Sequence, residues 1–232
     1  MTNSGLDSPL RCKLQAKTLV IEVRGAELTL GVEKCLWWEK YQSLFIADVH
    51  FGKSNHFRKA GIGVPLQLTQ EEVLRLQAVV DKYQPQKLVF LGDLFHSEYN
   101  RSVELFSKWL DGLGAMETIL VKGNHDIMLD EVYDTLGLEQ VEVLQQDGLL
   151  FSHDAIQGTG FYNIYGHVHP GVRLYGKGRQ SQRFPCFHCK DNEAVMPAFG
   201  LFTGYVSVKV QAGDRVFLIA GNEVVEARAS EE

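Results

Sequence analysis

Three short apolar segments, separated by stretches with helical periodicity, constrain the fold of this chain more than any other feature. The segments 43-SLFIAD-48, 87-KLVFLGD-93 and 117-ETILVKG-123 have apolar centres, which is typical of strands buried on both faces. Between them, residues 69–83 and 103–113 space apolar side chains three or four positions apart, as one face of a helix does. This alternation predicts a parallel sheet with crossover helices.

The second half of the chain has a different pattern. Its apolar runs are short and separated by turns, which predicts a second sheet. Because no linker separates the two halves, we expect one domain over residues 17–228, preceded by a frayed N-terminus over residues 1–16. A short helix is expected to end near Leu136. The predicted second-half strands lie within residues 140–144, 148–153, 161–167, 172–176, 205–210 and 215–221.

The charge balance and the hydropathy pattern exclude some classes of protein. The formal net charge is −6, which argues against a broad basic surface for wrapping nucleic acid. No apolar run is long enough for a transmembrane helix, so no membrane association is expected. The N-terminal sequence MTNSGLDSPLRCKLQ lacks the apolar core of a signal peptide, which predicts a cytoplasmic location.

The cysteines do not form a disulfide framework in a chain of this length. Cys186 and Cys189 make a single C-x₂-C, and a zinc site would need two more ligands, for example His188 with Cys12 or Cys35. We favour a structural role for this pair.

Side chains of the kinds that bind metals follow the predicted strands. Ligands in open α/β sheets collect at the carboxyl ends of strands, so these side chains are expected to converge. Mixed Asp, Asn and His donors suit Mn²⁺, Fe or Zn²⁺ better than Ca²⁺. Seven donors exceed one tetrahedral site, which favours two ions sharing a bridging carboxylate. The candidates are Asp48, His50, Asp93, Asn124, His153, His167 and His169.

The order of these motifs along the chain carries a resemblance to a known family. The series DVH, GDLFH, GNHD, SHD and GHVH, over residues 48–169, resembles the signature motifs of the calcineurin-like metallophosphoesterases. The resemblance implies an α/β fold, a four-layer sandwich with two facing mixed β-sheets flanked by helices. It also implies two divalent metal ions, most simply Mn²⁺, with Zn²⁺ or Fe as alternatives.

The resemblance also assigns roles to individual residues. One metal would be held by Asp48, His50, Asp93 and His169, and the other by Asp93, Asn124, His153 and His167, with Asp93 bridging. His125 would be the catalytic acid, and Asp126 would orient it. The implied reaction is phosphodiester hydrolysis by a metal-activated hydroxide, with proton donation by His125 contributing roughly 10²–10⁴-fold in rate.

Three further residues are candidates for binding the substrate. We expect Lys53 and Arg58 to reach the substrate phosphate, although solvated charges are the ordinary alternative. His96 would lie in the outer shell of the metals or simply pack or face solvent. His56 and His188 are interpreted as ordinary surface or loop residues, and Asp154 as a turn residue.

A closer resemblance is to the bacterial ligase-associated DNA damage response endonuclease (PdeM-like) family. It rests on residues 48–65, 88–97 and 184–204. It implies a phosphodiesterase or nuclease acting on nucleic acid or nucleotides, with a functional link to a DNA ligase/helicase system. The alternatives are a phosphatase or phosphodiesterase on small molecules, and a metal-binding, non-catalytic scaffold for a partner protein. The intact His125 argues against the scaffold, and the acidic net charge argues against long duplex DNA.

Overall fold

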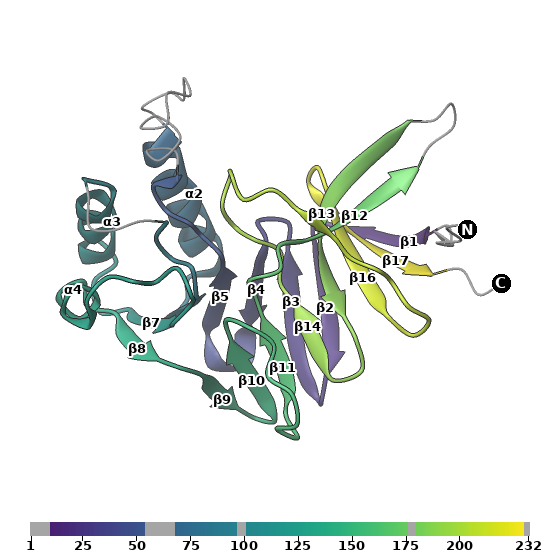
Figure 1. Ribbon diagram of the computed structural model, residues 1–232, viewed down its shortest axis with the longest axis horizontal. Helices are drawn as coiled ribbons and strands as arrows, with labels where there is room; N and C mark the ends of the chain where they lie inside the picture. The colour runs from purple at the N-terminus through teal and green to yellow at the C-terminus, as the bar shows by residue number, and fades with distance from the viewer. Residues whose placement is uncertain (1–9, 54–67, 97–100, 176–179, 230–232) are drawn as a thin grey trace, which may run out of the picture.

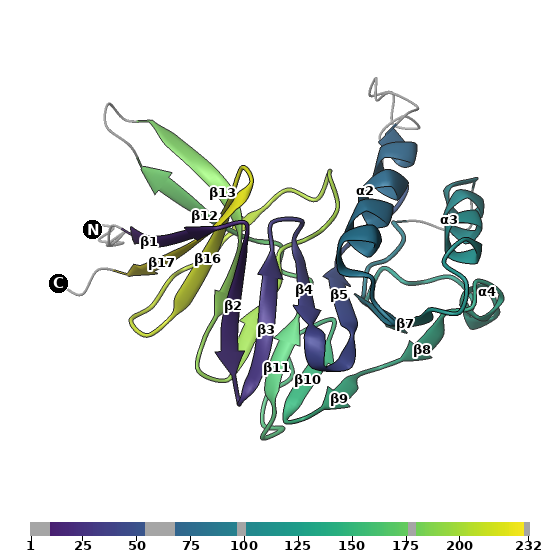
Figure 2. The same cartoon turned by 180° about the vertical axis from the view of Figure 1, so that it is seen from behind.

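Two β-sheets packed face to face form the body of the protein, and helices cover the outer face of one of them (Figures 1 and 2). The computed structural model describes residues 10–53, 68–96, 101–175 and 180–229. The predicted fold class of two facing mixed sheets in an α/β protein is therefore confirmed.

The first sheet has seven strands in the order β2-β3-β4-β5-β6-β7-β8. Pairing is antiparallel from β2 to β5 and parallel from β5 to β8. The three apolar segments of the sequence form the central strands β5, β6 and β7, buried over most of their length. The strands are β2 (Thr18–Val23), β3 (Ala26–Gly31), β4 (Cys35–Trp38), β5 (Ser43–Ala47), β6 (Lys87–Leu91), β7 (Glu117–Val121) and β8 (Glu139–Val141).

Within the part of the chain that the structure describes, three α-helices connect the parallel strands and lie together on one side of this sheet (Figure 1). Their apolar faces pack on the outer face of the sheet in a cluster that includes Phe90, Phe106 and Tyr133. None of the described helices combines the length and apolarity needed to cross a bilayer. The helices are α2 (Leu68–Tyr83), α3 (Arg101–Asp111) and α4 (Asp130–Thr135), and a 3₁₀ turn, η1 (Glu39–Tyr41), joins β4 to β5.

Over the described residues the second sheet has ten strands, with the main path β1-β17-β16-β13-β14-β11-β10-β9; β12 pairs with β13, and β15 pairs with β12. Part of the segment that we expected to be frayed forms β1, which pairs with β17. The strands are β1 (Leu10–Ala16), β9 (Leu144–Gln146), β10 (Leu149–Ser152), β11 (Tyr162–Tyr165), β12 (Pro170–Tyr175), β13 (Ser181–Cys189), β14 (Glu193–Val195), β15 (Val206–Ser207), β16 (Arg215–Ala220) and β17 (Glu223–Ala229).

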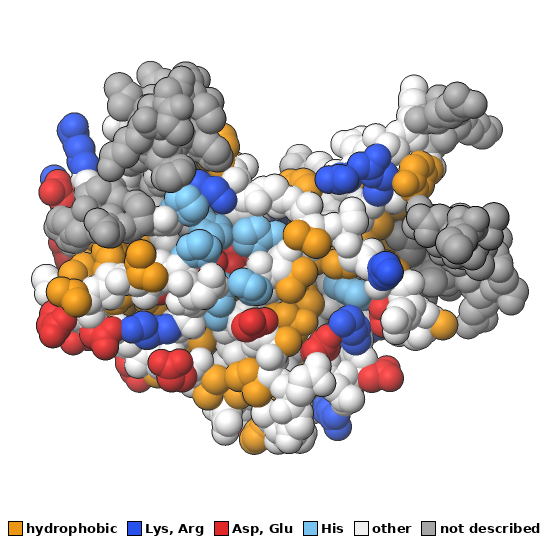
Figure 3. All heavy atoms as spheres, in the orientation of Figure 1, with side chains coloured by type: hydrophobic (Ala, Val, Ile, Leu, Met, Phe, Trp, Pro, Cys, Tyr) orange, Lys and Arg blue, Asp and Glu red, His pale blue; other side chains and the backbone are white. Residues whose placement is uncertain are grey.

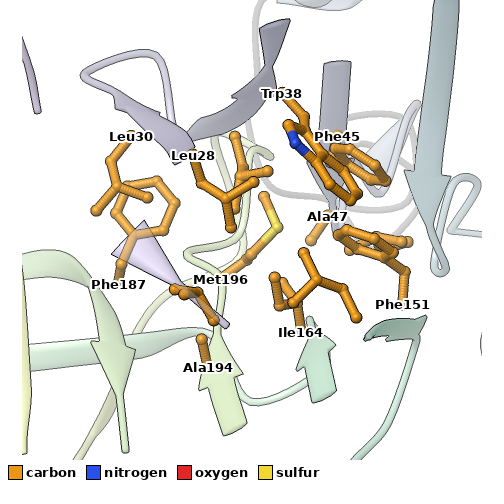
Figure 4. Close-up of a cluster of buried hydrophobic side chains, with 14 of the residues drawn as sticks. Leu28, Leu30, Trp38, Phe45, Ala47, Phe151, Ile164, Phe187, Ala194 and Met196 are labelled. Atoms are coloured by element: carbon orange, nitrogen blue, oxygen red, sulfur yellow. The ribbon is translucent and has the colours of Figure 1, made fainter. Parts of the chain in front are cut away.

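The main core fills the space between the two sheets (Figure 4). Phe45 of β5 and Phe151 of β10 stack across it, with ring centroids 4.0 Å apart and planes 11° apart. Each buried aromatic side chain of this kind contributes about 1.5–3 kcal/mol by leaving water. The shared core fixes the two sheets relative to each other, and with them the strand ends that carry the polar motifs.

We expected helices on the outer faces of both sheets, but the outer face of the second sheet is covered differently. Within the described ranges, β12 and the partly buried Val208 and Val210 cover it, in a cluster with Val172, Val216 and others. Helices therefore flank one sheet, and strands and irregular chain flank the other.

Candidate metal centre

The polar motifs after β5, β6, β10 and β11 meet at one edge of the two sheets, where Figure 3 shows histidine side chains gathered. The backbone there is not extended. Five of the predicted ligands have left-handed backbone conformations, which non-glycine residues adopt rarely and which recur at functional sites. Their φ angles are 52° at Asp48, 46° at His50, 50° at Asp93, 64° at His167 and 52° at His169.

Glycines that precede two of the ligands allow other ligands to approach closely. A Cβ on Gly92, next to Asp93, would lie 2.2 Å from Nδ1 of His153. A Cβ on Gly166, next to His167, would lie 2.6 Å from an Asp48 carboxylate oxygen. Because real Cβ atoms do not make such contacts, any larger residue at either position would displace a donor side chain.

The first cluster consists of Asp48, His50 and His169, whose donor atoms all lie within 4.8 Å of one another. Nε2 of His169 lies 3.5 Å from Oδ1 of Asp48 and 3.3 Å from Nε2 of His50. Burial, with the positive charge of Lys53 as the next cause, lowers the pKa of His50 to about 2. Its ring is therefore neutral and keeps a lone pair for a cation.

The second cluster consists of Asp93, His153 and His167, again with donor atoms within 4.8 Å of one another. Nε2 of His153 lies 3.1 Å from Nδ1 of His167 and 2.9 Å from Oδ1 of Asn124. The amide of Asn124 thus adds a fourth donor. All seven predicted ligands lie in one of these two clusters or in contact with one.

Asp93 belongs to the second cluster and also faces the first. Its Oδ2 is 3.6 Å from Nε2 of His50 in the first cluster, and its Oδ1 is 3.3 Å from Nε2 of His153 in the second. The backbone N–H of His125 also donates to Oδ1, at 2.9 Å. One carboxylate oxygen therefore faces each cluster.

The donor chemistry of both clusters fits divalent cations. Nδ1 of His153 is 3.0 Å from the carbonyl oxygen of Leu91, and since that oxygen can only accept, Nδ1 carries the proton. In the neutral ring Nε2 of His153 is then an acceptor, and it faces the acceptor oxygens of Asn124 and Asp93. Acceptors turned toward one another repel unless a cation lies among them. A carbonyl partner such as that of Leu91 typically fixes the tautomer of a metal-binding histidine.

His125 lies at the exposed edge of the site. Its ring centroid is 5.6 Å from that of His50 and 5.9 Å from that of His96. The buried carboxylate of Asp126 accepts hydrogen bonds from the backbone N–H groups of Gly123, at 2.9 Å, and Leu94, at 3.0 Å. Asp126 thus ties the His125 loop to the Asp93 loop through the backbone, and burial raises its pKa to about 6.

The three candidates for substrate binding have different outcomes. Lys53 is half-buried beside the first cluster, where the carboxylate of Asp93 partly offsets the lowering of its pKa by burial. His96 is partly buried, with its ring centroid 5.6 Å from that of His50. Arg58 lies outside the described residues, as does His56.

His188 contradicts the expectation of an ordinary surface or loop residue. It is 3% exposed, and its Nε2 lies 2.7 Å from Oδ2 of Asp214. In β13, His188 points to the same face as Cys186, whereas Cys189 points to the opposite face, because side chains alternate along a strand. The strand therefore separates the two cysteines of the C-x₂-C.

Sequence reasoning missed the residues that support the metal ligands from outside. The loop after β14 packs against the first cluster, where Gly200 N–H donates to the carbonyl of Asp48 and the carbonyl of Thr203 lies 3.3 Å from Nδ1 of His169. From α2, Arg75 donates to the carbonyl of Phe199, and Glu72 accepts from the N–H of Gly52. The resemblance over residues 184–204 includes Phe199, Gly200 and Thr203 but gave them no role, and the helical periodicity of α2 identified apolar positions.

The fold and the site define a metal-dependent hydrolase. A family model described as calcineurin-like phosphoesterase matches residues 42–222, so the chain belongs to that family. The structure is similar to that of the Pseudomonas putida nuclease MPE, with 26% sequence identity and a TM-score of 0.75 over 87% of this chain and 96% of that one. It also matches Yfce, a phosphoesterase from E. coli, with 13% identity and a TM-score of 0.41 over 82% and 99% of the chains. No curated protein matches the chain.

Proposed function

We propose that this chain is a dinuclear phosphodiesterase that cleaves nucleic acid, with Mn²⁺ as its metal. The observation that carries the proposal is the position of Asp93, with one carboxylate oxygen toward each donor cluster. The similarity to a nuclease over most of both chains supports nucleic acid as the substrate. Two divalent cations would neutralise phosphate oxygens and lower the pKa of a water molecule that attacks phosphorus.

The residues of the chain would divide the remaining tasks. Asp48, His50 and His169 would hold one cation, and Asn124, His153 and His167 the other, with Asp93 shared. The left-handed backbone at five of these positions holds the donors in place before the substrate binds, so little reorganisation accompanies the reaction.

His125 would donate a proton to the leaving oxygen. Its ring is exposed beside the first cluster, while its backbone N–H is anchored on Asp93, so the imidazole can reach a bound diester. Asp126 would position His125 through the backbone of the loop. Lys53, beside His50 of the first cluster, would contact the substrate phosphate.

A second candidate function is hydrolysis of small phosphate esters or nucleotides. A cavity of about 500 Å³ adjoins the second cluster, lined by Lys122, Asn124, Ile156 and others. Cavities of roughly 300–1,000 Å³ accommodate small-molecule ligands. A metal-binding scaffold for a partner protein is the alternative from another class.

We further propose a cytoplasmic role in DNA repair, linked to a DNA ligase/helicase system. The nuclease similarity supports an activity on nucleic acid, as such a role requires. The buried free thiols of Cys35, Cys186 and Cys189 fit a reducing compartment.

The proposal is tested by metal analysis and turnover with three substrates. Purified protein is loaded with Mn²⁺ and assayed on bis-p-nitrophenyl phosphate, p-nitrophenyl phosphate and single-stranded DNA. We expect two metal ions per chain, hydrolysis of the diester and cleavage of the DNA, all lost in Asp93→Asn. Metal binding without turnover on any substrate would favour the scaffold, and preference for the monoester without DNA cleavage would favour the phosphatase.

A further inference from the structure

The hairpin formed by β12 and β13 projects from the body of the protein (Figures 1 and 2). Strand β12 begins at Pro170, directly after the donor His169. In the antiparallel register, Arg173 lies opposite Arg183, and Tyr175 lies opposite Ser181. Arg173, Tyr175 and Arg183 are all exposed.

The placement of two arginines directly across a strand pair needs a physical reason. Like charges in this position repel each other and destabilise the pair. The opposite face of the hairpin cannot turn outward instead, because Val172, Leu174 and Phe184 pack into the apolar cluster on the outer face of the second sheet. The register therefore holds both guanidinium groups on one exposed face, where an anion would relieve the repulsion.

The local charge around the hairpin is opposite to that of the whole chain. The net charge of the chain is −6, yet residues 155–190 contain no Asp or Glu. The space-filling view shows Lys and Arg side chains over the hairpin, on the side of the molecule where the histidines are visible (Figure 3). A polyanion fits this face better than a neutral or basic partner does.

The arginine face is continuous with the metal centre. Gly171 shares the face with Arg173, and a Cβ on Gly171 would lie 2.6 Å from Cβ of Tyr205, an exposed aromatic residue. The N–H of Val206 donates to the carbonyl of His169, at 2.9 Å. At about 3.3 Å per residue, Arg173 lies roughly 13 Å along the strand from His169.

We propose that the face of the β12–β13 hairpin bearing Arg173, Tyr175 and Arg183 docks the sugar–phosphate backbone of a nucleic-acid strand that is cleaved at the metal centre. This inference rests on the proposed nuclease function. The guanidinium groups bind phosphates, and Tyr175 offers an aromatic ring for stacking a base.

The test compares a substrate that reaches the hairpin with one that does not. In Arg173→Ala/Arg183→Ala, we expect kcat/KM for single-stranded DNA to fall about tenfold or more. Turnover of bis-p-nitrophenyl phosphate should stay within about twofold, because that diester is too small to span from the metals to the hairpin. Binding of a fluorescent phosphorothioate oligonucleotide is measured by anisotropy at several salt concentrations. The slope of log K against log[salt] should become less negative by about 1.4, which is about 0.7 for each lost phosphate contact.

Matched variants show whether DNA cleavage depends on the two hairpin arginines or on the total positive charge of the chain. Arg24→Ala/Lys40→Ala also removes two exposed cations, but both line the groove at the other end of the first sheet. That variant should keep its activity on DNA. Arg173→Lys/Arg183→Lys should retain most DNA binding, and Arg173→Gln/Arg183→Gln replaces the alanine variant if it unfolds.

Three outcomes would overturn the proposal. The first is unchanged DNA cleavage in the hairpin variant, and the second is a loss of turnover on the small diester as large as the loss on DNA. The third is binding of the wild type to poly-glutamate as tight as its binding to the oligonucleotide. If the wild type hydrolyses the small diester but not DNA, the nuclease function fails. The docking face then stands only if the hairpin variant still loses salt-dependent oligonucleotide binding.

Discussion

At the scale of single residues, several of the groups that would do the chemistry have a strained backbone. Five donor residues have positive φ angles, and residues in such conformations cost of order 1–3 kcal/mol each. The surrounding contacts must offset that cost, for example the hydrogen bonds from Gly123 and Leu94 to Asp126. The donors are thereby held in position at some expense of overall stability.

His125 can be tested separately from the metal ligands, because its backbone contacts Asp93 while its ring is exposed. In His125→Ala, we expect kcat for bis-p-nitrophenyl phosphate to fall by roughly 10²–10⁴, the range for a lost general acid. Metal content, measured by elemental analysis, should stay at the wild-type value. Ile127→Ala, an exposed position on the same loop, serves as the control. Unchanged turnover in His125→Ala would show that another group donates the proton.

Glu72 predicts a pH dependence of stability. Burial raises the pKa of this carboxyl from 4.5 to about 7. Below about pH 4.5 the carboxyl of Glu72 is protonated in both the folded and the unfolded protein, so it does not change the free energy of unfolding. Above pH 7 the folded protein must hold a buried carboxylate. Stability therefore falls by about 3 kcal/mol as the pH rises through this window. Glu72→Gln should remove that loss, because its amide oxygen can still accept from Gly52.

The measurement is urea unfolding of both proteins in EDTA at pH 5 and pH 8. The variant should gain stability over the wild type at pH 8 and little at pH 5. The exposed neighbour Glu71 gives the control Glu71→Gln, which should show no such difference. An equal gain at both pH values would mean that the substitution acts through packing.

At the scale of elements, the sequence predicted which strands carry the site but not how their ends are shaped. Apolar runs followed by Asp or His identified β5 and β6, because a buried parallel strand must be apolar throughout. The spacing of Asp48 and His50 suggested a strand end with both side chains on one side. In the structure both follow β5 in left-handed turns, which depend on distant contacts such as that of Gly200 with Asp48.

The glycines before the donors give a prediction at this scale. Gly92 and Gly25 have similar φ angles, 74° and 80°, but a Cβ on Gly25 would meet nothing within 4 Å. Gly25→Ala should therefore cost only about 1 kcal/mol for its backbone conformation. Gly92→Ala adds a collision with His153, and we expect it to lose metal from the second cluster as well as more stability.

Thermal unfolding and metal analysis of the two glycine variants provide the comparison. If both lose the same stability and Gly92→Ala keeps the metal content of the wild type, the close approach of His153 has no role in the site.

At the scale of the whole molecule, the metal centre joins the two sheets. Asp48, Asp93 and Asn124 follow strands of the first sheet, whereas His153 and His167 follow strands of the second. The order of motifs along the chain predicted the donors, but the face-to-face packing of the two sheets decides which donors meet. The one-sided helical cover also depends on this packing, which local patterns do not encode.

Because the site spans both sheets, cations that bind there stabilise the fold as a whole. A ligand at about 100 times its Kd adds about 2.7 kcal/mol to the free energy of unfolding. For a chain of this size that corresponds to a rise in Tm of roughly 5–10 °C. We therefore expect Tm to be higher in Mn²⁺ than in EDTA and to rise with Mn²⁺ concentration. In Asp93→Asn, which loses the carboxylate that faces both clusters, Tm should respond little to Mn²⁺.

Amide exchange at the carboxyl ends of β5, β6, β10 and β11 should slow in Mn²⁺, while exchange in the β2–β3 turn, far from the site, should not change. The same Tm in EDTA and Mn²⁺, or the same shift in Asp93→Asn, would show that cations do not bridge the sheets.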